Sequence, residues 1–205
     1  KIMFKKLGVS SNTLCSHAVM RQILLDAYPG AKLWEGEKIE KEDSLIQFLK
    51  GCDAAIIGFE PVSDKVLSAL PQLKIISKFG AGCEKIDFEA LKKHNIRFGY
   101  TFGVNKLSVA ELTLSFMISG LRWVTPLNLS MRNGERPKNR NGRLLTGRTI
   151  GIHGCGNIGK EVVRLLKPFD CTILSCDIKE FPDFYKSYDV KPVPFKELLE
   201  RSEIL

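Results

Sequence analysis

Three glycines and one acidic residue toward the C-terminal end of the 205-residue chain have the types and spacing of a nucleotide-binding turn. Gly154, Gly156 and Gly159 form the pattern G-x-G-x-x-G, and Asp177 follows 18 residues after the last of them. In such a turn the glycines permit a tight bend, a close approach of the backbone to a pyrophosphate, and close packing of the next helix. An acid about 20 residues further on accepts hydrogen bonds from ribose hydroxyls. The spacing therefore predicts a dinucleotide site.

The segments around this pattern are those that such a site needs. An apolar run at Thr149–His153 predicts a strand before the glycines, and an amphipathic helix is predicted up to Leu166, where Pro168 stops it. A second strand is predicted at Thr172–Cys176, with Asp177 at its carboxyl end. With the strand, helix, strand and acid all present, a purely structural glycine turn is the less favoured alternative.

The chemistry of the cofactor follows from the same residues. The backbone N–H groups of Asn157 and Ile158, at the start of the helix, are expected to meet the phosphates, because a helix N-terminus favours negative charge. The carboxylate of Asp177 would repel a 2′-phosphate, so NAD is favoured over NADP. Lys179 lies close enough in sequence to leave NADP open.

The rest of the chain alternates short apolar runs with amphipathic stretches. Strands are predicted at residues 3–9, 54–58, 73–77 and 96–98, and helices at residues 16–27, 43–49, 63–70, 88–94, 107–124 and 195–201. In the helix at 16–27, Val19, Ile23 and Leu24 are expected on one face. The 107–124 helix is expected to end before Pro126, with a second helical piece up to Met131 and a polar loop at 133–141. This alternation predicts the α/β class, with parallel sheets covered by helices on both faces.

The composition excludes several classes of protein. No run of 18 apolar residues exists, so a membrane span is not expected, and Lys1 to Gly8 does not have the features of a signal peptide. The six cysteines form no C-x-x-C pair and only three histidines accompany them, so a metal site is not expected and reduced thiols in the cytoplasm are favoured. The net charge of +8 is concentrated between Arg132 and Arg148, where a solvated loop is favoured over a nucleic-acid site.

The histidines give no sequence signal for catalysis. His153 ends an apolar strand just before the glycines, and a core histidine is the favoured interpretation over an acid–base role. His17 and His94 lie in predicted helices and are interpreted as surface or structural residues.

Three segments, residues 73–87, 105–111 and 145–159, together resemble the D-isomer-specific 2-hydroxyacid dehydrogenase family, which includes phosphoglycerate dehydrogenases. The resemblance covers essentially the whole chain. It implies a flavodoxin-like substrate domain at residues 1–104, lacking a C-terminal return, and an incomplete, truncated Rossmann NAD-binding domain at residues 105–205. It also implies an oxidoreductase that binds NAD and a small anionic 2-hydroxy or 2-keto acid, and a cytoplasmic homodimer built around the helix at 108–124. Neither nucleic acid nor a membrane is expected as a partner.

The resemblance also assigns roles to residues. The backbone N–H groups of Ala81 and Gly82 would hold the substrate carboxylate, and Lys78 would help to hold a charged substrate group. Thr101 would contact the cofactor, together with the glycines, Asn157, Ile158 and Asp177. Glu84 and Lys85 depart from the Asp-Asn that the family often has here.

The catalytic residues of the family are not carried onto this chain. The resemblance places its arginine, glutamate and histidine later than Leu205, so we expect the 205 residues alone to show no turnover. The family activity, with 3-phosphoglycerate as the first substrate to consider, is the leading hypothesis. A non-enzymatic, NAD-sensing interaction protein resembling the corepressors of the family is the alternative. A nucleic-acid binder that uses the basic stretch is a third, weaker one.

Overall fold

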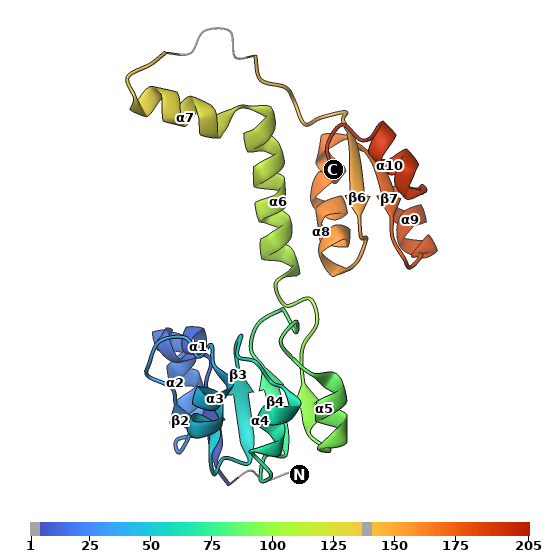
Figure 1. Cartoon of the computed structure of the whole chain (residues 1–205). Coiled ribbons are helices and arrows are strands. Elements are labelled where there is room, and N and C mark those ends of the chain that lie inside the picture. Colours follow the sequence, from blue (N-terminus) through green and yellow to red (C-terminus); the bar gives the residue numbers. More distant parts are fainter. Residues whose placement is uncertain (1–4, 137–140) are drawn as a thin grey trace. The chain divides into compact units, whose positions relative to one another are not determined.

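The computed structural model describes residues 5–136 and 141–205, and it divides into two compact units, Lys1–Val104 and Asn105–Leu205 (Figure 1). Each unit has its own parallel sheet and its own hydrophobic core. The roles that the sequence assigned to the two units, substrate binding and cofactor binding, stay predictions.

The first unit contains a five-stranded parallel sheet in the order β2-β1-β3-β4-β5. Its strands are β1 (Leu7–Val9), β2 (Lys32–Leu33), β3 (Ala54–Ile57), β4 (Ile75–Lys78) and β5 (Arg97–Gly99). This order is that of flavodoxin-like sheets, so the predicted fold class of this unit is confirmed. Parallel strands end at the same edge of the sheet, and the segments after β1, β3, β4 and β5 therefore meet there.

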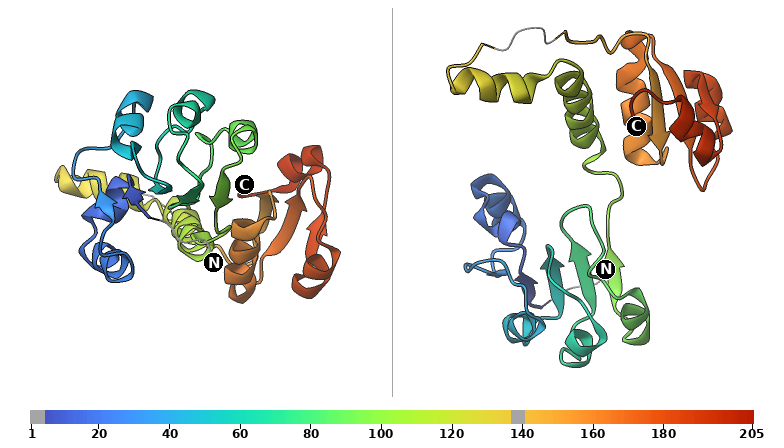
Figure 2. Two further views of the ribbon diagram at one scale, coloured as in Figure 1. Left: turned by 90° about the horizontal axis from the view of Figure 1, so that it is seen from below. Right: turned by 45° about the horizontal axis from the view of Figure 1, so that its top comes forward.

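Helices cover both faces of this sheet. They are α1 (Asn12–Ser16), α2 (Ala18–Ala27), α3 (Glu42–Leu49), α4 (Asp64–Ser68) and α5 (Phe88–Lys93). Figure 2 shows α2 on one face and α3, α4 and α5 on the other. Within this unit, a hydrophobic cluster lies on each face of the sheet, and the side chains of β3 alternate between them. Ala55 and Ile57 belong to one cluster, and Ala54 and Ile56 to the other. This alternation is the period-2 pattern of a strand that is buried on both sides.

The helix predicted at 16–27 is present as α2, but it begins two residues later than predicted. His17 separates it from α1 and caps it: the Nδ1 of His17 accepts a hydrogen bond of 3.4 Å from the N–H of Met20. Of the three apolar residues predicted on one face, Leu24 is buried, whereas Val19 and Ile23 are 62% and 65% exposed. Periodicity identified the apolar face of the helix but could not show that the sheet covers only part of it.

The second unit contains the parallel strands β6 (Thr149–His153), β7 (Thr172–Cys176) and β8 (Val190–Pro192), in that order across the sheet. Its helices are α6 (Lys106–Leu121), α7 (Val124–Arg132), α8 (Asn157–Leu166), α9 (Pro182–Tyr188) and α10 (Phe195–Arg201), with the 3-10 turn η1 (Lys167–Phe169) after α8. A single parallel bridge joins Ile204 to Ile150, on the side of β6 opposite β7. Placing successive strands on both sides of the first one is the arrangement of a Rossmann sheet.

Helix α8 lies across this sheet and buries an apolar face that contains Val162, Val163 and Leu166. It packs on one side against β6 and on the other against α6, which contributes the buried Ala110 to the same core. Figure 2 shows α8 and α9 on one face of the sheet and α10 on the other. The strand–helix–strand unit predicted around the glycines is therefore present.

Helices α6 and α7 confirm the predicted break before Pro126 and the second helical piece that follows it. The first helix ends at Leu121, three residues earlier than predicted, and the chain turns at Trp123, whose φ is +56°, so that Pro126 lies in the first turn of α7. Among the described residues, no single helix is long and apolar enough to cross a membrane. Only α6 and α7 counted together reach that length and composition, and they are bent by 63°. Residues 137–140 of the predicted polar loop lie outside the described residues.

Candidate functional site

The glycine turn joins β6 to α8. Gly154 has a φ of +94°, a backbone conformation that residues with a Cβ rarely adopt. Its N–H donates a hydrogen bond of 2.8 Å to the carbonyl oxygen of Cys176. A Cβ on Gly159 would collide with the carbonyl oxygen of Gly154. The first and third glycines are therefore required by the backbone itself, as the sequence pattern predicts.

The middle of the turn faces open space. A Cβ on Gly156 would meet no atom within 4 Å. Gly156 is also the N-cap of α8, and no side chain accepts a hydrogen bond from the N–H groups of the first turn. Asn157 and Ile158, the first two residues of α8, are exposed. Unpaired N–H groups at the end of a helix dipole beside open space form a suitable surface for a phosphate.

Asp177 closes the site from the neighbouring strand. Its Oδ2 accepts a hydrogen bond of 2.6 Å from the N–H of Cys155, and its Oδ1 accepts one of 3.0 Å from the N–H of Lys179. The carboxylate thus supports the glycine turn directly, which the sequence did not reveal. Each carboxylate oxygen has a second lone pair, so both can still accept a hydroxyl hydrogen bond.

A cavity of about 340 Å³ lies beside Asp177. Residues after β7 and around the end of β8 form most of its wall, and the lining comprises Ser175, Cys176, Asp177, Lys179, Glu180, Tyr185, Pro192, Val193 and Pro194. Sequence analysis missed the contribution of β8 and α9, because no motif marks them. The space has the position and size needed for a base attached to the ribose that Asp177 would hold.

Cys155 lies inside the glycine pattern but is fully buried, and burial raises the pKa of its thiol. Ser175 and Tyr185 are buried nearby, and the hydroxyl of Ser175 has no hydrogen-bond partner that meets standard geometry. A buried neutral thiol is a poor nucleophile, so Cys155 serves as a packing residue beneath the turn.

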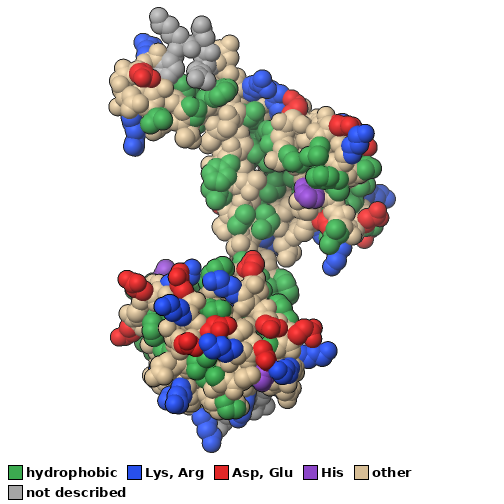
Figure 3. All heavy atoms as spheres, viewed as in Figure 1, with side chains coloured by type: hydrophobic (Ala, Val, Ile, Leu, Met, Phe, Trp, Pro, Cys, Tyr) green, Lys and Arg blue, Asp and Glu red, His purple; other side chains and the backbone are tan. Residues whose placement is uncertain are grey.

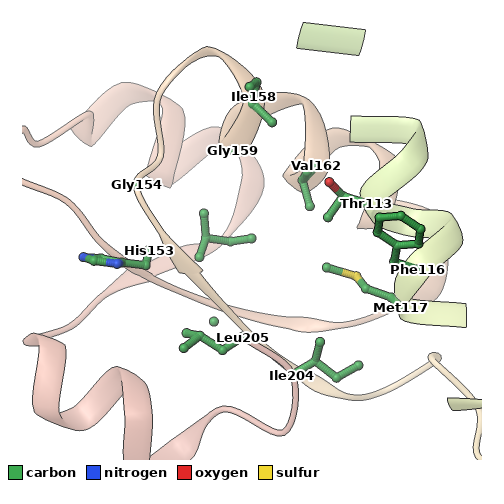
Figure 4. Close-up of a pocket in the computed structure, with 12 residues that line it drawn as sticks. Thr113, Phe116, Met117, His153, Gly154, Ile158, Gly159, Val162, Ile204 and Leu205 are labelled. Atoms are coloured by element: carbon green, nitrogen blue, oxygen red, sulfur yellow. The ribbon is translucent and has the colours of Figure 1, made fainter. Parts of the chain in front are cut away.

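A larger hollow of about 570 Å³ lies on the other side of the glycine turn (Figure 4). Thr113, Phe116 and Met117 of α6 face Val162 of α8 across it, while His153 points away from α6. The interpretation of His153 as a core histidine was wrong: it is exposed, and its ring lies 4.9 Å from that of Phe195. His153 is the last residue of β6, and the last buried side chain of this strand is that of Ile152.

These observations test whether the chain can hold a nicotinamide dinucleotide. The open turn at Gly156, the unpaired first turn of α8 and the free lone pairs of Asp177 all lie at the carboxyl ends of β6 and β7. That edge of a parallel sheet is where α/β folds bind nucleotides. The residues present therefore fit the pyrophosphate and the adenosine ribose.

In the first unit, the turn after β4 contains the residues assigned to the substrate. Gly80 has a φ of +111°, Ala81 is exposed and Gly82 is half-buried. No described residue accepts a hydrogen bond from the N–H of Ala81 or Gly82. The Nζ of Lys78 donates to the carbonyl of Phe79 over 3.0 Å, which directs it toward this turn.

The structure therefore gathers the predicted site residues in two places. Those assigned to the pyrophosphate and ribose lie together in the second unit, namely Gly154, Gly156, Asn157, Ile158, Gly159 and Asp177. Those assigned to the substrate, Lys78, Ala81 and Gly82, lie together in the first unit. Thr101 is exposed after β5.

One buried carboxyl in the first unit had no sequence signal. Glu60 is 2% exposed, and one of its oxygens accepts a hydrogen bond from the N–H of Gly58. Ser10 and Ser11, also buried, lie beside it at the end of β1, and burial raises the pKa of the carboxyl. This cluster stabilises the loop after β3 at the same sheet edge as the turn after β4.

Two other groups of polar residues do not form reactive sites. Ser68, His94 and Asp64 lie together, but the serine and aspartate oxygens contact the same ring atom, Nε2, at 3.4 and 2.7 Å. A proton relay needs both ring nitrogens, so this is a link between α4 and α5. Within residues 5–136 and 141–205, no group of three or more His, Cys, Asp or Glu side chains could hold a metal ion.

Comparison with known proteins gives a consistent picture. Residues 14–190 match the family described as D-isomer specific 2-hydroxyacid dehydrogenase, catalytic domain. The chain belongs to this family. The family prediction from the three sequence segments is confirmed, and so is the two-domain α/β fold class.

Two members of curated protein families match most of the chain. A glyoxylate reductase from Korarchaeum cryptofilum is 31% identical over 84% of this chain and 54% of its own length. Human D-3-phosphoglycerate dehydrogenase is 30% identical over 87% of this chain and 33% of its own length. The chain thus spans only a third to about half of these family members.

Solved structures of the family superpose on almost the whole chain. The apo form of D-lactate dehydrogenase from Escherichia coli covers 97% of it with a TM-score of 0.78 and 23% identity, and 63% of that enzyme is matched. An acyclic imino acid reductase in complex with NADPH and D-Arg covers 97% with a TM-score of 0.81 and 19% identity. At these identities the superpositions establish the fold alone.

Proposed function

We propose that this chain is the cofactor- and carboxylate-binding part of an NAD-dependent oxidoreductase that acts on a D-2-hydroxy acid. The observation that carries the proposal is the link between Asp177 and the glycine turn. It brings a carboxylate that can accept hydrogen bonds from ribose hydroxyls and a helix N-terminus that suits a phosphate into one place. Family membership supports the same reaction class.

In this proposal the protein binds and orients, while the nicotinamide supplies hydride transfer when it is bound. The first turn of α8, at Asn157 and Ile158, holds the pyrophosphate through backbone N–H groups, and Asp177 accepts hydrogen bonds from the ribose hydroxyls. The free N–H groups of Ala81 and Gly82 hold the carboxylate of a small 2-hydroxy or 2-keto acid, and Thr101 contacts the cofactor. The negative charge of Asp177 selects NAD over NADP.

The cofactor proposal is tested by titrating the 205-residue chain with NADH and NADPH and following NADH fluorescence. We expect NADH to bind more tightly than NADPH. Asp177→Asn should weaken NADH binding about 10- to 100-fold, because hydrogen bonds to a charged group contribute about 1.5–3 kcal/mol. It should also reduce the preference for NADH, because the repulsion of a 2′-phosphate is lost.

Asp170→Asn is the matched control for this test. It removes the same charge from the same unit, and asparagine tolerates the positive φ of +51° found at Asp170. It should leave both affinities unchanged. Equal binding of NADH by the wild-type chain and Asp177→Asn would overturn the assignment of Asp177.

The substrate is proposed from the turn after β4. A 2-keto acid presents a planar carboxylate, and the partly buried Lys78 adds a positive charge beside the turn, which suits a second anionic group. We therefore propose 3-phosphoglycerate as the first of the 2-hydroxy acids to be tested with the complete protein. NAD-dependent oxidation of another 2-hydroxy acid with a higher kcat/KM would reject this choice.

We further propose a homodimer in the cytoplasm. Between Leu112 and Met131 the sequence carries a single charge, Arg122, and α7 buries none of its residues within the chain. Figure 3 shows hydrophobic side chains exposed along this stretch. A second copy presenting the same face would cover them. The six free cysteines support a reducing compartment.

A further inference from the structure

The turn that presents Ala81 and Gly82 is tied to a residue that no motif includes. The hydroxyl of Tyr100, in the segment that follows β5, donates a hydrogen bond to the carbonyl oxygen of Ala81. Nineteen positions separate the two residues in sequence, so the bond joins the segments that leave β4 and β5. It is the only hydrogen bond from a side chain to the backbone of residues 80–82 among those the structure describes.

This bond determines where the next N–H group points. The carbonyl of Ala81 and the N–H of Gly82 belong to one planar peptide group, in which they point in opposite directions. Holding the oxygen toward Tyr100 therefore directs the N–H of Gly82 away from it. That N–H has no acceptor among the described residues, and Gly82 is half-buried. A directed but unused donor is what a bound anion requires.

The ring of Tyr100 is itself fixed. It stacks against Phe98 with centroids 6.2 Å apart and meets Phe102 edge to face at 4.5 Å. Phe98 in turn packs edge to face on Phe88 of α5, at 5.4 Å. Aromatic contacts on two sides restrict the ring, so holding its hydroxyl on the turn costs little rotamer freedom.

The glycine residues make this support necessary. Gly80, at a φ of +111°, and Gly82 flank Ala81, so the peptide between Ala81 and Gly82 has few steric restraints of its own. The carboxylate of Glu84 lies where a Cβ of Gly82 would be, and it would attract the N–H of Gly82. This attraction favours rotation of the peptide group between Ala81 and Gly82. A hydroxyl bond on the carbonyl side opposes this rotation.

We propose that Tyr100 is a positioning residue for substrate recognition: its hydroxyl fixes the peptide group that presents the N–H of Gly82 to a carboxylate. The inference rests on the proposed function, because it takes the turn as the carboxylate site. It adds a residue outside the turn on which the affinity for the substrate depends.

The test uses the isotopically labelled 205-residue chain and oxalate as the carboxylate probe. The amide resonance of Gly82 is followed by NMR during the titration, which tolerates millimolar affinities, with sodium chloride at equal ionic strength as the reference. Tyr100→Phe keeps the ring and its aromatic contacts but removes the donor. Tyr28→Phe, at a 46% exposed tyrosine of the same unit, is the matched control.

We expect saturable movement of the Gly82 amide in the wild-type chain and in Tyr28→Phe. In Tyr100→Phe the affinity for oxalate should fall about 5- to 10-fold, as for the loss of one hydrogen bond. In the absence of oxalate, the Gly82 amide resonance of Tyr100→Phe should differ from that of the wild type. The thermal unfolding midpoint of Tyr100→Phe should match that of Tyr28→Phe. A purely structural role would change the midpoint and leave the affinity of the folded protein intact.

Two results would count against the proposal in different ways. Equal affinity of the wild-type chain and Tyr100→Phe would overturn the role of Tyr100 and leave the carboxylate turn standing. An unresponsive Gly82 amide in the wild-type chain would overturn the carboxylate turn and the role of Tyr100 together. The cofactor proposal at Asp177, which is tested with NADH, would be unaffected by either result.

Discussion

At the scale of single residues, the proposed cofactor site depends on a backbone contact as much as on any side chain. Gly159 lies so close to the carbonyl of Gly154 that even a methyl group has no room. Gly159→Ala must therefore push α8 away from β6 or distort the turn. We expect it to lower the free energy of unfolding by about 1–3 kcal/mol, as overpacking does, and to weaken NADH binding.

Gly120→Ala provides the opposite case. Gly120 lies in α6, and no atom would lie within 4 Å of an added Cβ. Alanine should stabilise the helix by about 0.5–1 kcal/mol and leave NADH binding unchanged. Urea unfolding and NADH titration of both variants test the pair. A Gly159→Ala protein that is as stable as the wild type would contradict the contact on which the argument depends.

Removing the charge of Glu84 should change the affinity for oxalate in the opposite direction to removing the hydroxyl of Tyr100. Its carboxylate lies beside Gly82, where a substrate carboxylate is proposed to bind, and it is exposed. Glu84→Gln should tighten oxalate binding about 2- to 3-fold at low salt, because exposed charges interact weakly in water. The gain should shrink at 0.5 M salt. Unchanged binding at low salt would show that the carboxylate does not compete for the turn.

The residues that the sequence identified are those whose role depends on local backbone geometry. Gly154 and Gly159 are needed by a turn and a close contact only a few residues apart, so a short pattern reveals them. Tyr100 and the environment of His153 could not be predicted. Their partners, Ala81 and Phe195, are distant in sequence and meet only in the folded chain.

At the scale of elements, an ion-pair cluster joins α6 to α8. The carboxylate of Glu161 lies 2.9 Å from the Nζ of Lys106 and 2.8 Å from Arg164, and its side chain is 13% exposed. The hydrogen bond from Lys106, followed by that from Arg164, lowers the pKa of Glu161 below its usual value. A carboxyl with a lowered pKa in the folded state stabilises the fold when it is ionised.

The pH dependence follows from this direction. The stabilisation by Glu161 is complete above the pKa of the unfolded chain, about 4.3, and is lost as the pH falls through the lower pKa of the folded state. Glu161→Gln should therefore be less stable than the wild type at pH 7, with a difference that disappears in acid. Urea unfolding at pH 7 and pH 3 measures it. Glu200→Gln, at an exposed pair in α10, is the control and should change stability less.

Predicting the elements from sequence worked best where a segment buries a regular apolar face. The strand–helix–strand unit around the glycines was predicted because α8 buries one regular apolar face. The helix at 16–27 was predicted with a start two residues too early, because the cap at His17 has no clear sequence signal and much of the apolar face is exposed. The strand β2 has only two residues, too few to show a period, and β8 buries only its first residue, Val190.

At the scale of the whole molecule, the two units differ in how they are completed. Each has a separate core and a separate sheet, and the first closes around β3 at its centre. In the second, α6 and α7 add apolar surface that the unit does not bury: Leu112, Phe116, Leu129 and Met131 are 51–71% exposed. Contiguous exposed apolar surface of this kind marks an interaction site.

We propose that a second copy of the chain covers the exposed apolar surface of α6 and α7. In a twofold dimer the same face meets itself, so a charge placed on it meets a like charge on the partner. Phe116→Glu with Met131→Glu should convert a dimer to a monomer in light scattering at micromolar concentration. Val19→Glu with Ile23→Glu, an equally exposed apolar pair on α2, should leave the dimer intact. A wild-type chain that is monomeric at 100 μM, or that partitions into lipid vesicles instead of pairing, would reject the dimer.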